Sequence, residues 1–161
     1  MIKAIMAIDE EGGVSRNGTL PWPDNKRDLQ WFESQTRDNV VIMGSKTYDD
    51  PHMPRPLPGR TNYVITSRVD SYPKVNKIVT AIPQTIREIE QYYPKKTIWI
   101  IGGPSIIDQT LHLIQEFYIS RIPGQHNCDT FLNMEPIKEN FIRNTKVIHP
   151  NVTFEIWRKQ R

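Results

Sequence analysis

An acidic side chain among aromatic ones is the feature of this sequence best suited to chemistry. Asp28 precedes Trp31 and Phe32 by three and four positions, so on a helix the three side chains would share one face. A carboxylate beside aromatic rings either meets a cation or favours its neutral form, and its pKa shifts accordingly. Such a group suits proton transfer or recognition of a basic ligand. The alternative is a helix-capping acid, because aspartate is common in first turns.

The segment 41–47 (VIMGSKT) could bind a phosphate group. It runs from an apolar strand through Gly44 toward a helix start, and helix N-termini offer free N–H groups and the positive end of a dipole to an anion. Ser45 and Thr47 add hydroxyl donors, and Lys46 adds a positive charge. The segment is not a P-loop, so taken alone an ordinary strand-to-helix turn is the simpler interpretation.

The segment 98–106 (IWIIGGPSI) repeats the order of strand, glycine and helix. Gly102 and Gly103 would let a ligand lie against bare backbone. A third strand ends in the sequence TSR at 66–68. Three such strand ends on one sheet favour a nucleotide site over chance turns.

Arg68 and Lys46 indicate which nucleotide would bind. An arginine near the adenosine ribose is the usual receptor for a 2′-phosphate, whereas NAD sites prefer an acid there. For a dinucleotide, NADPH is therefore favoured over NADH. The alternative is that both residues are solvated surface cations.

Length and composition indicate one soluble domain spanning residues 1–161. The chain is 37% hydrophobic and 24% charged, which is ordinary for a globular domain. No apolar run reaches the length of a membrane span, and no signal peptide is recognisable. One cysteine, Cys128, excludes an internal disulfide, so we expect a cytoplasmic protein. The net charge of +3 favours anionic partners, either nucleic acid or a phosphorylated small molecule.

Apolar, β-branched runs alternate with helical patterns along the chain. We predict strands at 2–8, 39–43, 62–66, 77–80, 97–101, 116–122 and 153–157, and helices at 25–35, 83–92 and 104–113. This alternation predicts an α/β fold with a mixed, mostly parallel sheet. The last strands follow one another without a convincing helix, which predicts a C-terminal antiparallel hairpin.

These motifs together resemble the bacterial and phage type of dihydrofolate reductase over nearly the whole chain. The matching segments are 5–9 (IMAID), 20–22 (LPW), 28–32 (DLQWF), 41–44 (VIMG) with 46–47 (KT), 55–60 (RPLPGR), 62–68 (NYVITSR), 100–103 (IIGG) and 129–131 (DTF). The resemblance implies an eight-stranded sheet flanked by about four helices, with NADPH and folate lying across it. It also implies reduction of 7,8-dihydrofolate to tetrahydrofolate, by hydride transfer to C6 and protonation of N5, in one-carbon and thymidylate metabolism.

The resemblance assigns roles on the substrate side. Asp28 would accept hydrogen bonds from the pterin's N3 and 2-amino group and help to protonate N5. Ser120 matches a hydroxyl position that bonds both the acid and the amino group, and Arg60 would pair with the glutamate's α-carboxylate. Leu20 and Trp22 match the end of a mobile loop, and Trp22 could position a water near Asp28. The other residues matched to the substrate are Ile5, Ala7, Leu29, Phe32 and Leu57.

Two of these roles have ordinary alternatives. Without the resemblance, Arg60 could equally be a turn residue after Pro58 and Gly59. Trp22 could be plain core packing, or it could serve both purposes.

On the cofactor side, the resemblance assigns phosphate contacts to Lys46, Thr47, Ser67 and Arg68. It places residues 102–107 under the pyrophosphate and implies a cis peptide between the two glycines. The complete set matched to NADPH is Ala7, Val14, Leu20, Gly44, Ser45, Lys46, Thr47, Thr66, Ser67, Arg68, Ile101, Gly102, Gly103, Pro104, Ser105, Ile106, Ile107 and Thr130. The four histidines form no ligand pair, so no metal site is predicted.

The sequence departs from the family pattern at several positions. Val14 and Ser15 replace an Ile-Gly pair in the mobile loop, which narrows its backbone freedom. Ile107 replaces a tyrosine near the nicotinamide, and Ser45 replaces a frequent arginine. The segment 50–54 lengthens the loop on the substrate side.

Two other functions are compatible with parts of the sequence. A related NADPH-dependent reductase of a pterin or an aminopyrimidine would not need Arg60 as a receptor for a glutamate tail. A basic, non-catalytic nucleic-acid-binding domain would concentrate its charge, which here is spread. We therefore expect a monomer that binds dihydrofolate and antifolate inhibitors, with neither nucleic acid nor membrane as a partner.

Overall fold

An eight-stranded mixed sheet forms the centre of the computed structural model, which describes residues 1–160. In spatial order its strands are β5 (Asn76–Ile78), β4 (Thr61–Ile65), β3 (Val40–Gly44), β6 (Ile98–Ile100), β1 (Ile2–Ile8), β7 (Glu116–Arg121), β10 (Val152–Lys159) and β9 (Phe141–His149). Neighbours from β5 to β7 are parallel, and β10 is antiparallel to both β7 and β9. The predicted mixed sheet and its C-terminal antiparallel hairpin are confirmed.

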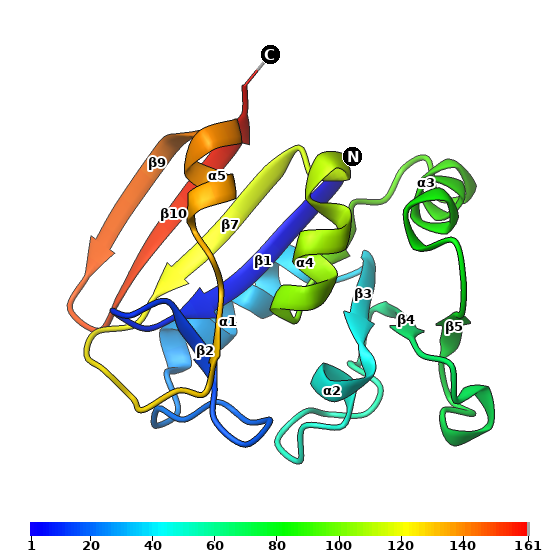
Figure 1. Cartoon of the computed structure of the whole chain (residues 1–161), viewed down its shortest axis with the longest axis horizontal. Coiled ribbons are helices and arrows are strands. Elements are labelled where there is room, and N and C mark those ends of the chain that lie inside the picture. The colour runs from blue at the N-terminus through cyan, green and yellow to red at the C-terminus, as the bar shows by residue number, and fades with distance from the viewer. Residues whose placement is uncertain (161) are drawn as a thin grey trace.

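Helices cover both faces of this sheet. Residues 1–160 contain five α-helices, where about four were expected: α1 (Lys26–Thr36), α2 (Ser45–Tyr48), α3 (Ile82–Tyr92), α4 (Pro104–Thr110) and α5 (Glu135–Asn140). They also contain two short 3₁₀ turns, η1 (Val69–Ser71) and η2 (Leu111–Leu113). In the view of Figure 1, α4 and α5 lie in front of the sheet and α1 lies behind it.

Helix α5 and a second, two-stranded sheet were not predicted. The expectation that no helix separates the last strands is wrong, because α5 begins with Glu135-Pro136 and precedes β9. Its six residues are too few to produce a recognisable 3.6-residue period. The second sheet pairs β2 (Gly13–Ser15) with β8 (Thr130–Phe131), and strands this short carry almost no pattern.

The central strands bury both of their faces, as their continuous apolar runs predict. On β3 and β6, Ile42 and Ile100 pack on the side of α3, α4 and α5. Val41, Met43 and Trp99 pack on the side of α1, since side chains alternate between the faces of a strand. The sheet is thereby fixed between two apolar layers.

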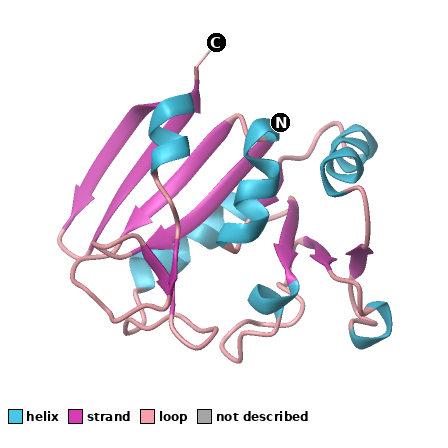
Figure 2. Cartoon of the chain, in the orientation of Figure 1, coloured by secondary structure: helices cyan, strands magenta, loops and turns pink. Residues whose placement is uncertain are grey.

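The carboxyl ends of the parallel strands meet at one edge of the sheet, where long loops gather (Figure 2). Such an edge is where open α/β sheets bind ligands. Among residues 1–160, no helix is both long enough and apolar enough to cross a membrane.

Candidate active site

A cavity of about 1240 Å³ opens at this edge of the sheet. Its floor comes from strands of the sheet, including Ile5 in the middle of β1 and, at or near strand ends, Gly44 on β3, Ile65 on β4 and Ser120 on β7. Ile101, directly after β6, completes the floor. A largely apolar hollow with a few converging polar groups is typical of a small-molecule site.

Helix α1 forms one wall of the cavity. Its N-cap Asn25 and the helix residues Asp28, Leu29, Phe32 and Glu33 line the hollow, at the i, i+3, i+4, i+7, i+8 spacing of one helical face. The Asn25 side chain accepts a hydrogen bond of 3.0 Å from the backbone N–H of Asp28. Asn25 is therefore the capping residue, and the Asp28 carboxyl group is left to face the cavity.

The Asp28 carboxyl group is almost buried, with 7% of the residue exposed. Burial raises its pKa, and the nearby Ser120 hydroxyl partly opposes this rise. Ser120 is itself 1% exposed. The environment thus favours retention of a proton on Asp28 to a higher pH than on a solvated aspartate.

Trp31 does not share the cavity with Asp28 and Phe32, although the spacing predicted one common face. Its ring stacks with those of Phe154 and Tyr118, at centroid distances of 4.1 and 5.7 Å. Trp31 therefore anchors α1 to the sheet. The cavity position beside Asp28 is taken by Leu29.

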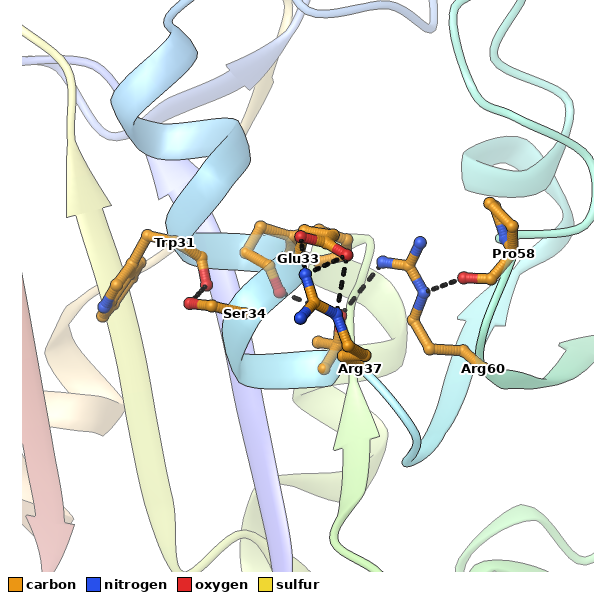
Figure 3. A network of polar contacts seen from close by, with 8 residues as sticks. Trp31, Glu33, Ser34, Arg37, Pro58 and Arg60 are labelled. Carbon is orange, nitrogen blue, oxygen red and sulfur yellow. Dashed lines mark hydrogen bonds and ion pairs between the residues drawn. The ribbon is translucent and has the colours of Figure 1, made fainter.

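Arg60 lies on the cavity wall at the other end of α1. Its Nε donates to the carbonyl of Pro58 at 2.9 Å, and its Nη1 donates to Thr36 Oγ1 at 3.1 Å (Figure 3). The guanidinium carbon lies 5.9 Å from the centre of the Phe32 ring. These contacts hold a planar cation in a fixed direction, which suits recognition of a carboxylate.

The two strand–glycine–helix turns lie side by side. Gly44 precedes α2 and Gly103 precedes α4, and the Gly44 N–H donates to the Gly102 carbonyl at 2.8 Å. The Gly102–Gly103 peptide is cis, as the resemblance implies. A Cβ atom on Gly44 would come within 3.2 Å of Ile106, and one on Gly102 within 3.2 Å of Met6. These positions are therefore tight for any side chain, and the φ of +113° at Gly102 also favours glycine.

Most residues predicted for the site line the cavity, and five do not. The residues that line it are Ile5, Ala7, Val14, Leu20, Trp22, Asp28, Leu29, Phe32, Gly44, Ser45, Lys46, Thr47, Leu57, Arg60, Ile101, Gly103, Pro104, Ser105, Ile106, Ser120 and Thr130. The five outside it are Thr66, Ser67, Arg68, Gly102 and Ile107.

Ile107 and Arg68 lie outside for different reasons. Ile107 is 1% exposed because α4 turns it into the apolar core. The Arg68 guanidinium donates to the Tyr72 hydroxyl at 2.8 Å and lies 3.6 Å from the Asp49 carboxylate. Tyr72 in turn donates to Asp49 at 2.8 Å. Arg68 thus belongs to a small ion-pair network beside the cavity.

A contact between two loops at the cavity was not predicted. Thr19 Oγ1 donates to Asp50 Oδ1 at 3.1 Å and lies 2.8 Å from His52 Nδ1. All three residues line the cavity, so the contact joins the loop before α1 to the loop after α2. The lengthened segment 50–54 was the only sequence signal. The other unpredicted lining residues are Met6, Ser15, Gly18, Pro23, Asp24, Asn25, Glu33, Met53, Pro54, Ile65 and Asp129.

The cavity lies at the carboxyl ends of parallel strands, with glycine turns on one side and a buried acid on the other. Nucleotide-dependent α/β enzymes have this arrangement. The family model described as dihydrofolate reductase matches residues 1–154. The chain therefore belongs to the dihydrofolate reductase family.

Individual relatives agree with this assignment. The dihydrofolate reductase of Drosophila melanogaster is 30% identical over 144 residues, covering 82% of this chain and 79% of the relative. The type 8 dihydrofolate reductase of Escherichia coli is 27% identical and covers 99% of this chain and 96% of the relative. The solved structure of the Enterococcus faecalis dihydrofolate reductase, complexed with NADP(H) and RAB-propyl, superposes with a TM-score of 0.82. That structure is 25% identical and covers 100% of this chain and 97% of its own.

Proposed function

We propose that this protein reduces 7,8-dihydrofolate to 5,6,7,8-tetrahydrofolate with NADPH. The observation that carries the proposal is the nearly buried Asp28, facing a large apolar cavity in a chain of this family. Reduction of a C=N bond needs a hydride and a proton, and NADPH supplies the hydride when it is bound. The protein must bind both molecules and manage the proton.

Asp28 is the group that handles the proton. Its carboxyl group, raised in pKa by burial, binds the pterin's N3 and 2-amino group and favours protonation at N5. The nearby Ser120 hydroxyl favours the charged form of this carboxyl group. Trp22, which is 6% exposed and packs near His126, lines the same cavity and orients water toward Asp28.

The apolar lining orients the flat pterin ring and excludes water from it. Ile5, Leu29, Phe32 and Leu57 surround the ring and the aminobenzoyl group, and exclusion of water strengthens the hydrogen bonds to Asp28. Arg60 binds the α-carboxylate of the glutamate tail. Leu20, which is 44% exposed, is free to close over the bound rings with its loop.

The glycine turns fit a dinucleotide phosphate. A Cβ atom on Gly103 would meet no other atom within 4 Å, so the backbone there is open to a ligand. Ser45, Lys46, Thr47 and Ser105 add donors and charge around this turn. The relative from Enterococcus faecalis was solved with NADP(H), which supports the same cofactor here. Lys46 and the nearby Arg68 provide the positive charge that a 2′-phosphate requires.

We also propose that residues 1–161 act as one cytoplasmic, monomeric domain, with nucleic acid outside its range of partners. Both apolar layers pack on one sheet, which supports one domain. The same cavity would accept flat antifolate inhibitors, consistent with the second ligand in the Enterococcus faecalis complex.

The direct test follows NADPH by its absorbance at 340 nm with purified protein and dihydrofolate. We expect absorbance to fall only when protein, NADPH and dihydrofolate are all present. No decrease, with protein that a thermal melt shows to be folded, would refute the proposed function.

A further inference from the structure

A charged cluster lies at the end of the cavity farthest along α1 from Asp28. Glu33 lines the cavity, and its carboxylate accepts hydrogen bonds from Nε of Arg37 at 2.9 Å and from Nη2 at 2.7 and 2.6 Å. Arg60 lies beside this pair, as Figure 3 shows. The cluster therefore contains two arginines and one acid.

The position of Glu33 places it at the tail end of the substrate. Asp28 and Glu33 both line the cavity and are five residues apart on α1, which corresponds to a rise of roughly 7.5 Å along the helix. Asp28 marks the headgroup end of the wall, whereas Arg60 and Glu33 mark the other end. A bound glutamate tail therefore meets an acid as well as a cation.

We propose that Glu33 is a specificity-determining residue that competes with the second carboxylate of the substrate's tail for Arg37. This inference rests on the proposed function. A glutamate tail has two carboxylates, and the fork of Arg60 serves one of them. Arg37 does not itself line the cavity, but it pairs with Glu33, which does, and Glu33 occupies two of its nitrogens.

The exchange is physically feasible because the Glu33–Arg37 pair is half exposed, with 46% of the acid side chain and 58% of the arginine side chain accessible. Exposed pairs of this kind are weak, so a substrate carboxylate can replace Glu33. Burial lowers the pKa of Arg60, the negative charge of Glu33 raises it, and the positive charge of Arg37 lowers it. The charges of both residues therefore act on Arg60. Glu33 thus reduces the affinity of this end of the cavity for a dianionic tail.

The test compares the wild type with Glu33→Gln on three substrates: dihydrofolate, its γ-amide with one tail carboxylate, and 6-methyl-7,8-dihydropterin without a tail. We expect Glu33→Gln to lower the KM for dihydrofolate by about two- to fivefold, the range of one exposed ion pair. The KM values for the amide and for the tail-free pterin should stay within error. Arg37→Gln should raise the KM for dihydrofolate.

Two further variants make the test decisive. Glu88→Gln removes an equivalent exposed charge from α3, outside the cavity, and should leave all three KM values unchanged. In the Arg37→Gln background, Glu33→Gln should have a clearly smaller effect on the KM for dihydrofolate, because no arginine remains to be released and only the repulsion between Glu33 and the tail is relieved.

Each contrary result is distinct. An unchanged KM for dihydrofolate, an equal decrease for the tail-free pterin, an equal effect of Glu88→Gln, or an effect of undiminished size without Arg37 would overturn this inference alone. A folded wild type that reduces none of the three pterins would overturn the proposed function, and this inference with it.

Discussion

Replacement of Arg60 by leucine removes the cation that we assign to the substrate's α-carboxylate. Leucine keeps an apolar side chain beside Phe32, so the wall of the cavity stays filled. The bonds lost within the protein are those to the Pro58 carbonyl and to Thr36 Oγ1. Thr36 keeps its bond to the Phe32 carbonyl at 2.8 Å, and Pro58 lies at the exposed surface. The fold should therefore lose little stability.

The expected loss of binding follows from the geometry of the fork. Hydrogen bonds to charged groups contribute about 1.5–3 kcal/mol, which corresponds to a rise in KM of roughly 10- to 140-fold. Turnover at saturating substrate should change little, because the carboxylate is far from the reacting atoms and is bound equally before and during the reaction.

The assay measures KM and kcat for dihydrofolate and for 6-methyl-7,8-dihydropterin at 340 nm. Arg27→Leu is the matched control, since Arg27 is an exposed arginine on α1 that contacts His149 outside the cavity. We expect a large rise in KM only for Arg60→Leu and only with dihydrofolate. An unchanged KM, or an equal rise for the tail-free pterin, would contradict the assignment of Arg60.

Three further predictions concern the cofactor, the buried acid and the second sheet. Lys46→Gln should raise the KM for NADPH several-fold more than that for NADH, because only NADPH carries the 2′-phosphate; equal effects would exclude this role. Asp28→Asn should stabilise the fold by about 0.5–2 kcal/mol above neutral pH. Its raised pKa means that the wild type loses stability as pH rises through that pKa, so the gain in urea unfolding should vanish in acid. Gly13→Ala should destabilise the protein by about 1–3 kcal/mol, because the new Cβ would collide with Cys128; an unchanged melting temperature would contradict this packing.

Local patterns in the sequence were sufficient for the central part of the fold and site. The runs 40–43 and 98–101 are continuous and apolar because β3 and β6 are covered on both faces. Asp28 could be singled out because aromatic residues follow it at helical spacing, and one of them, Phe32, shares the cavity with it. The glycines at 44, 102 and 103 marked turns that the structure places together.

Features that depend on tertiary contacts could not be predicted. Ile107 is buried because its face of α4 packs against the core. Arg68 pairs with Asp49 because the fold places the two side chains close together. The contact of Thr19 with Asp50 joins loops that are distant in sequence. Trp31 was expected on the face of Asp28 because periodicity cannot tell adjacent positions of one wide helical face apart.

The role of the buried acid is tested most directly by the turnover of Asp28→Asn. The variant keeps the shape of the side chain but cannot transfer a proton as a carboxyl group does. With saturating NADPH and dihydrofolate at pH 7, and folding verified by thermal melting, kcat should fall by roughly 10²- to 10⁴-fold. A variant that turns over as fast as the wild type would contradict the account.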